Sequence, residues 1–382
     1  MGRVLDFDAP VEFLDMDRKR RSLQDGIALC LSGGGYRAMV FHIGVLWRLY
    51  DAGLLGSIKR ISSVSGGSIT AGVLALAWPK LSFDPARSGT DFVTHVVGPL
   101  RRMAETTIDS GSVIAGALLP GTISDKVTNH YRKVLFSDAT LQDLPDEPRF
   151  VINATNVQSG VLWRFSKPYM RDWRVGEVKN PKVSLARAVA ASSAFPPVLS
   201  PCKLELHEDD FTPDTGVDLQ RPPYTTDVIL SDGGVYDNLG LETVYKRYET
   251  VLVSDAGGQM QAEPEPKSDW GQHSYRVLNL IDNQVRNLRK RQLIEAYRRG
   301  DRKGAYWGIR SNIEDYGLAQ TLPCPHDRTM KLAGIATRLR RMSDGEQNRL
   351  INWGYAVTDA ALRRHVDEAL VVGRFPYPES GV

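Results

Sequence analysis

The stretch IALCLSGGGYR, residues 27–37, decides the fold class. Its first five residues form a continuous apolar run, which is typical of a strand buried on both faces of a parallel sheet. Three glycines follow, and from Met39 to Tyr50 apolar residues then recur at spacings of three and four, before Gly53. That spacing predicts a helix over 36–52. Strand, glycine turn and helix together are the repeating unit of α/β sheets.

The same pattern recurs along the chain. A second helical pattern over 68–78 is apolar almost all round, which indicates a buried helix. We expect a three-layer α/β/α fold, with helices on both faces of a mostly parallel central sheet. Four further short apolar runs are predicted to be strands of that sheet: 58–62, 150–153, 228–230 and 251–253.

The composition is that of a globular protein. Of 382 residues, 42% are hydrophobic and 24% are charged, which argues against a disordered or fibrous chain. The formal net charge is only +3, so the overall charge gives no case for a nucleic-acid partner. Cys30, Cys202 and Cys324 lie far apart and form no CxxC pair, which fits a reducing compartment and no structural zinc. We expect neither a metal nor a cofactor, and the oligomeric state stays open.

We divide the chain into three parts: an N-terminal arm (1–25), an α/β core (26–275) and a basic, mainly helical C-terminal region (276–382) packed on the core. Residues 205–226 form an acidic insertion whose spacing fits no EF-hand, so we interpret it as a solvated loop. The first 25 residues contain no signal peptide, and no stretch approaches the ~18 apolar residues that a spanning helix needs. We therefore expect a cytoplasmic protein without a membrane-spanning helix.

The glycine loop, Gly33 to Gly35, predicts an anion site. Backbone amides can converge there without side chains in the way, and the following helix adds its positive N-terminal dipole. Two interpretations compete: a phosphate cradle and an oxyanion hole for acyl transfer. The GxGxxG spacing fails at Ala38, and a tight structural turn is the plainest alternative.

The serine turn Ser63-Val64-Ser65-Gly66-Gly67 follows the next predicted strand and opens the next helix. A nucleophilic serine at such a turn holds its hydroxyl above the sheet edge, and its neighbours must be small. The usual glycine two residues before the nucleophile is Ser63 here. A serine that merely caps the helix is the structural alternative.

Asp232 follows the predicted strand 228–230 and is itself followed by two glycines. We expect it at the same sheet edge as the glycine loop and Ser65, where a carboxylate can accept the serine proton. Asp255-Ala256-Gly257-Gly258 also follows a buried strand. We prefer Asp232 because its Asp-Gly-Gly motif is contiguous and its strand follows the acidic insertion.

In their order along the chain, these motifs resemble the patatin-like phospholipase family. The glycine loop with Arg37, the serine turn and the Asp-Gly-Gly motif are joined by an Ala/Ser/Pro-rich block at 190–197. The resemblance covers roughly residues 26–260. It implies a lipid acyl hydrolase with a Ser–Asp dyad in a patatin-like fold.

The resemblance also implies a role for each site residue. Ser65 is the nucleophile and Asp232 the general base. Arg37 steadies the loop or the developing oxyanion. The oxyanion hole is formed by backbone around the glycine loop and the next turn: Gly33, Gly34, Gly35 and Gly66.

A histidine triad is the alternative to the dyad. His42 is nearest in sequence to the glycine loop. An α/β-hydrolase places its histidine after the acid, which leaves His273, His326 or His365, and none of these has a supporting pattern. The early glycine loop therefore favours the dyad.

Contact with lipid needs a surface and an entrance. Residues 276–303 contain nine basic and three acidic residues, a net charge of +6. Because the whole chain has a net charge of +3, the rest of the chain carries −3. Interleaved apolar residues predict a basic amphipathic helix that rests transiently on anionic lipid, although its arginines can equally pair within the protein. The apolar, small-residue stretch 110–121 is either a mobile flap or an ordinary buried helix.

Two other functional classes stay open. One is a regulated lipase that attacks membranes only when a ligand or partner binds, and the other is a catalytically silent scaffold of the same shape. The intact serine, aspartate and glycine loop argue against the scaffold. The sequence does not separate phospholipid, lysophospholipid, acylglycerol and small-ester substrates.

Overall fold

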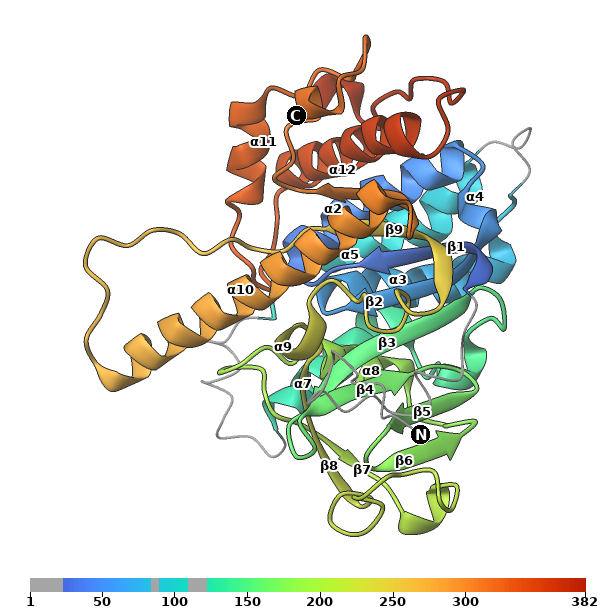
Figure 1. Cartoon of the computed structure of the whole chain (residues 1–382), viewed down its shortest axis with the longest axis vertical. Coiled ribbons are helices and arrows are strands. Elements are labelled where there is room, and N and C mark those ends of the chain that lie inside the picture. The colour runs from blue at the N-terminus through green and yellow to red at the C-terminus, as the bar shows by residue number, and fades with distance from the viewer. Residues whose placement is uncertain (1–22, 84–88, 109–121) are drawn as a thin grey trace, which may run out of the picture.

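The computed structural model describes residues 23–83, 89–108 and 122–382, and in these ranges one sheet of ten strands organises the chain (Figure 1). Five neighbouring strands run parallel in the order β10-β9-β1-β2-β3. The predicted mostly parallel α/β sheet is therefore confirmed at its centre. These strands are β1 (Gln24–Leu31), β2 (Ile58–Val64), β3 (Arg149–Asn156), β9 (Tyr248–Asp255) and β10 (Lys303–Gly308).

Beyond β3 the sheet continues with antiparallel strands. β8 pairs with both β3 and β7, so the acidic insertion lies in the connection of a β7–β8 hairpin. The expectation that the run 228–230 joins the parallel sheet is wrong, because β8 runs antiparallel to β3. The strands are β4 (Val161–Phe165), β5 (Tyr169–Asp172), β6 (Gly176–Lys179), β7 (Cys202–Glu205) and β8 (Asp227–Asp232).

Both faces of the central strands are buried, as their apolar runs predict. Leu29 and Leu31 of β1 enter a large core on one face, and Ala28 and Cys30 enter a second core on the other. The large core is covered by α2 (Gly35–Asp51), α3 (Gly66–Ala77), α8 (Leu185–Ser192) and α12 (Asp344–His365). The second is covered by α10 (Trp270–Arg299), which contributes Leu293 and crosses in front of the sheet (Figure 1). This is the predicted three-layer arrangement.

The C-terminal region is interwoven with the rest of the chain. Its strand β10 extends the sheet beside β9, which the sequence did not predict. Its helix α12 packs closely against α2 at two glycines. A Cβ on Gly44 would overlap the Ile351 carbonyl, and a Cβ on Gly354 would overlap the Phe41 carbonyl. The predicted boundary at residue 275 between a core and a C-terminal region stays a prediction. The remaining α-helices within the described residues are α4 (Thr90–Phe92), α5 (Gly98–Ala104), α7 (Ile123–Tyr131), α9 (Gly234–Asp237) and α11 (His326–Ala333).

Two predicted segments fall largely or wholly outside the described residues: most of the N-terminal arm (1–22) and the flap candidate at 110–121. Among the helices that are described, none is both long and apolar enough to cross a bilayer.

Candidate active site

Ser65 stands at a strained turn between β2 and α3. Its backbone has φ 52° and ψ −121°, a conformation that costs a non-glycine residue energy and that persists where the surroundings enforce it. Ser65 occupies the N-cap position of α3, yet its side chain makes no capping hydrogen bond. The capping alternative therefore does not account for this serine.

The neighbours of Ser65 are small because backbone crowds the turn. A Cβ on Gly66 would overlap the carbonyl oxygen of Gly35, and one on Gly67 would overlap that of Leu31. Ser63, where the motif usually has glycine, is accommodated by hydrogen bonds. Its hydroxyl accepts from the Ser68 hydroxyl at 3.0 Å and donates to a carbonyl of β3 at 3.4 Å.

Ser192, in the Ala/Ser/Pro-rich block, connects the serine turn to β3 through two hydrogen bonds. Its hydroxyl accepts the Ser65 N–H at 3.0 Å and donates to the Asn153 carbonyl at 2.6 Å. The same block holds the aspartate, since the Asp232 amide donates to the Ala194 carbonyl at 2.9 Å. The block predicted only as a family feature thus bridges the two turns of the site.

Asp232 reaches Ser65 by a route that the sequence did not reveal. We expected the carboxyl end of a parallel strand, but β8 enters the sheet from the opposite direction. Along β3, the strand β8 pairs with the last three residues alone, and Asp232 faces Ala154 there. In the parallel pair of β2 and β3, Val64 faces Asn153, so Ser65 and Asp232 stand at the same level of the sheet.

The carboxyl group of Asp232 is buried, with 1% of the residue exposed. Its Oδ1 accepts the Gly234 amide at 2.7 Å, while Oδ2 has no hydrogen-bond partner of ordinary geometry in the described ranges. Burial raises the pKa of Asp232 to about 7, and Asp282 adds to the rise by repulsion. The Gly234 amide and the nearby Ser65 hydroxyl oppose this rise in pKa. Catalytic hydrogen bonds are often long or poorly aligned before substrate binds, so the absence of a well-aligned hydrogen bond to Oδ2 does not argue against the pair.

The glycine loop lies directly against Ser65. A Cβ on Gly33 would come 3.0 Å from the Cβ of Ser65. The Gly33 amide donates to the Asn238 carbonyl at 3.2 Å, so it is not free to bind an oxyanion. The amides of Gly34, Gly35 and Gly66 donate to no acceptor in the described part of the chain. Gly34 (φ 145°) and Gly35 (φ 60°) have backbone angles that favour glycine.

Arg37 is buried behind the loop. Nη1 donates to the carbonyls of Ala333 and Ile335 at 3.3 and 2.5 Å, and Nη2 donates to that of Ala256 at 3.0 Å. The third guanidinium nitrogen of Arg37, Nε, has no hydrogen-bond partner within the described residues. Burial, together with repulsion from the nearby Arg310, lowers the pKa of Arg37 to about 10. Of the two roles considered for Arg37, this geometry favours steadying the loop.

His42 is engaged away from the Ser65–Asp232 pair. Its Nε2 lies 3.0 Å from the Ser32 carbonyl and its Nδ1 lies 3.1 Å from the Ser254 hydroxyl. Burial lowers the pKa of His42 to about 4, which leaves the imidazole neutral. The second candidate acid, Asp255, ends β9 on the far side of β1, where its carboxylate accepts the Tyr306 hydroxyl at 2.8 Å.

No group of three or more metal-ligating side chains occurs in the ranges that the structure describes.

Comparisons with known proteins identify the family of this chain. A model of the family described as patatin-like phospholipase matches residues 29–245, more than half of the chain. The chain therefore belongs to the patatin-like phospholipase family, whose members are lipid acyl hydrolases. No curated protein sequence matches it.

Solved structures of low identity resemble parts of the chain. Human GIVD cytosolic phospholipase A2 in complex with methyl γ-linolenyl fluorophosphonate is 14% identical, with a TM-score of 0.49, over 91% of this chain and 59% of that one. Another structure of human GIVD cytosolic phospholipase A2 is 13% identical, with a TM-score of 0.40, over 66% of this chain and 51% of that one. VipD from Legionella pneumophila is 15% identical, with a TM-score of 0.31, over 82% and 67%. The chain thus spans between half and three fifths of these two human structures.

Proposed function

We propose that this protein is a serine lipid acyl hydrolase of the phospholipase A or lysophospholipase type, with Ser65 as nucleophile and Asp232 as general base. The observation that carries the proposal is the pairing of a strained serine with a buried carboxyl group whose pKa lies near neutrality. Free backbone amides beside the serine complete the set of groups that acyl transfer needs.

The reaction begins when the ester carbonyl places its oxygen against the amides of Gly34, Gly35 and Gly66. The Ser65 oxygen attacks the carbonyl carbon, and the serine proton passes to Asp232. When the tetrahedral intermediate collapses, the alcohol or lysolipid leaves with that proton. Water then attacks the acyl-enzyme in the same way and releases the fatty acid.

Each supporting group acts through position. Gly33 gives Ser65 room, and Arg37 fixes the loop from behind through its three carbonyl contacts. A lone carboxylate is a weak base for a hydroxyl, so the oxyanion donors must supply a large part of the rate.

We also propose transient contact with a membrane through α10. The charge argument is weaker than the sequence suggested, since Arg276, Arg289 and Arg299 of this helix form ion pairs with Glu263, Glu242 and Glu295. Exposed apolar side chains along the helix support the contact instead, because such a face can lie in the headgroup region of a bilayer. They are Trp270, Val277, Leu278, Leu280, Ile281, Val285 and Leu288.

The test is a product assay by mass spectrometry on vesicles of mixed lipids. We expect wild type to release fatty acid and a lysolipid or alcohol, and the Ser65→Ala protein to release neither. Ser57→Ala, which changes an exposed serine, is the matched control and should behave as wild type. Hydrolysis that persists in purified, folded Ser65→Ala would overturn the assignment of the nucleophile. Release by wild type alone would also identify the lipid class and the acyl position.

A further inference from the structure

A second polar pocket lies at the carboxyl ends of β9 and β10, on the far side of β1 from β2. It has a volume of about 530 Å³ and is walled by α10 and by residues near α11. The Asp255-Ala256-Gly257-Gly258 turn, which the proposed acyl hydrolase does not use, forms part of its lining. The carboxyl ends of parallel strands are where open α/β sheets bind ligands.

Three permanent cations converge on this pocket: Arg286, Lys290 and Arg310. Arg286 donates to the Gly258 carbonyl and to the Asn283 side chain, and Arg310 donates to the Ala333 carbonyl at 3.0 Å. The Lys290 ammonium lies 4.6 Å from the centre of the Tyr306 ring. None of the three forms an ion pair with a described acidic residue, in contrast to Arg289 and Arg299 of the same helix.

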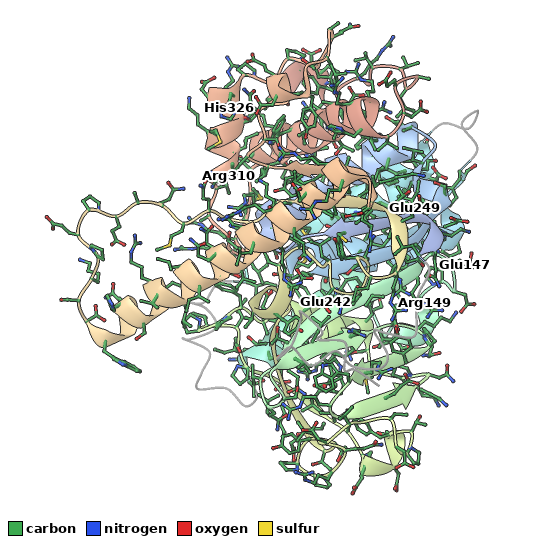
Figure 2. The ribbon with its side chains drawn as sticks, in the orientation of Figure 1. Glu147, Arg149, Glu242, Glu249, Arg310 and His326 are labelled. Atoms are coloured by element: carbon green, nitrogen blue, oxygen red, sulfur yellow. The ribbon has the colours of Figure 1, made fainter. Side chains whose placement is uncertain are left out.

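The acidic residues of the pocket do not neutralise these cations. Asp255 directs Oδ1 at the Gly257 amide and Oδ2 at the Tyr306 hydroxyl, both at 2.8 Å. Asp315 is exposed at the edge. His326 and His365 also line the pocket, and Figure 2 places Arg310 between α10 and the α11 helix that begins at His326. Among the residues that line the pocket, the three fixed cations therefore exceed the two carboxylates before either histidine is protonated. Outside the lining, one further carboxylate, Asp282, and one further guanidinium, Arg37, lie close to these cations.

Glycines keep the floor of the pocket open. A Cβ on Gly257 would overlap the Arg286 guanidinium, and one on Gly308 would come 3.2 Å from the Tyr306 hydroxyl. Backbone and guanidinium groups are thus brought together without intervening side chains. Guanidinium and ammonium groups around a glycine turn are the arrangement that binds phosphate oxygens.

We propose that this pocket binds a phosphate-bearing ligand through Arg286, Lys290 and Arg310. A pocket of this size holds a small organic phosphate. The pocket adjoins the oxyanion loop: a Cβ on Gly257 would come 3.0 Å from Asn238, whose Oδ1 lies against Gly33. The phosphate is either that of a free small molecule or that of a lipid headgroup.

The experiment measures binding to the full-length Ser65→Ala protein by isothermal titration calorimetry at constant ionic strength. Calorimetry reads binding and not turnover, so the result does not depend on the proposed acyl transfer. The probes are inorganic pyrophosphate and short-chain dibutyroyl phosphatidic acid, with chloride as the control anion. Lys290→Gln is compared with Arg291→Gln, its exposed neighbour on α10, which does not line the pocket.

We expect at least one probe to bind, Lys290→Gln to weaken it about tenfold or more, and Arg291→Gln to leave it within about twofold. Arg310→Gln should weaken the same probe, and circular dichroism checks that each variant is folded. Tighter binding of pyrophosphate identifies a soluble phosphate, and tighter binding of phosphatidic acid identifies a headgroup. Binding of neither probe, or equal weakening by Lys290→Gln and Arg291→Gln, would overturn the proposal.

Discussion

At the residue scale, the pairing of Ser65 with Asp232 is the most informative feature of the molecule. The serine is held in a backbone conformation that it would not adopt freely, and the carboxyl group is removed from water. Burial disfavours the charged carboxylate, which makes Asp232 a stronger base than an exposed aspartate. The same environment therefore strains the proposed nucleophile and strengthens its proposed base.

The dyad predicts a definite dependence of the rate on pH. Asp232 must be deprotonated to act as base, and its pKa is about 7. We expect kcat/KM for a soluble ester to rise about tenfold per pH unit below pH 7 and to level off above it. Initial rates from pH 5 to 9 would measure this. A rate that is already maximal at pH 5 would contradict the assigned base.

Sequence motifs were sufficient to select Ser65, Asp232 and the glycine loop as candidates. They did not reveal Ser192 or Asn238, because a buried serine or asparagine that binds backbone carries no spacing pattern of its own. The Ala/Ser/Pro-rich block was the only available signal for Ser192. They also did not separate the Gly33 amide, which binds Asn238, from the free amides of Gly34 and Gly35.

At the scale of elements, continuous apolar runs identified all five of the predicted strands, and the spacing of apolar residues identified α2 and α3. The direction of β8 was not predictable, because an apolar run reads the same in a parallel and an antiparallel pair. The strands β4 to β7 and β10 are short and half-buried or Gly-containing, so their pairing depends on tertiary neighbours.

The contact between the serine turn and the glycine loop predicts that Gly66→Ala is harmful. The new methyl group would push the Gly35 carbonyl away and displace the donors of the proposed oxyanion hole. Loss of one such donor typically costs about 100-fold in kcat, so we expect at least that loss here. Gly271→Ala near the exposed start of α10 is the matched control, since a Cβ there meets nothing closer than 3.6 Å. Similar ester hydrolysis rates in the two purified variants would contradict the predicted geometry.

At the scale of the whole molecule, the small net charge conceals an uneven distribution. Residues 276–303 carry +6, and the rest of the chain carries −3. The sequence could not reveal most of these ion pairs, because partners such as Glu242 and Glu249 lie on other elements. Figure 2 places both of these glutamates on the main body of the molecule, away from the projecting end of α10.

The proposed membrane contact predicts a selective loss of activity on vesicles. Leu278 and Ile281 are 63% and 51% exposed on α10. Replacing both with serine should lower binding to vesicles and vesicle hydrolysis about tenfold, because it removes apolar area that can enter the bilayer. Hydrolysis of a soluble ester should not change. The double variant Gln284→Ser and Gln292→Ser on the same helix is the control, and equal flotation of the two double variants with vesicles would argue against this face.

The most direct test of the central claim is covalent labelling of the nucleophile. A fluorophosphonate transfers its phosphonyl group to an activated serine oxygen and loses fluoride, and peptide mass spectrometry locates the adduct. We predict one adduct on Ser65 in wild type, none in Ser65→Ala, and labelling at least about 100-fold slower in Asp232→Asn, because the base that accepts the serine proton is lost. An adduct on another serine, or labelling of Asp232→Asn at the wild-type rate, would contradict the proposed dyad.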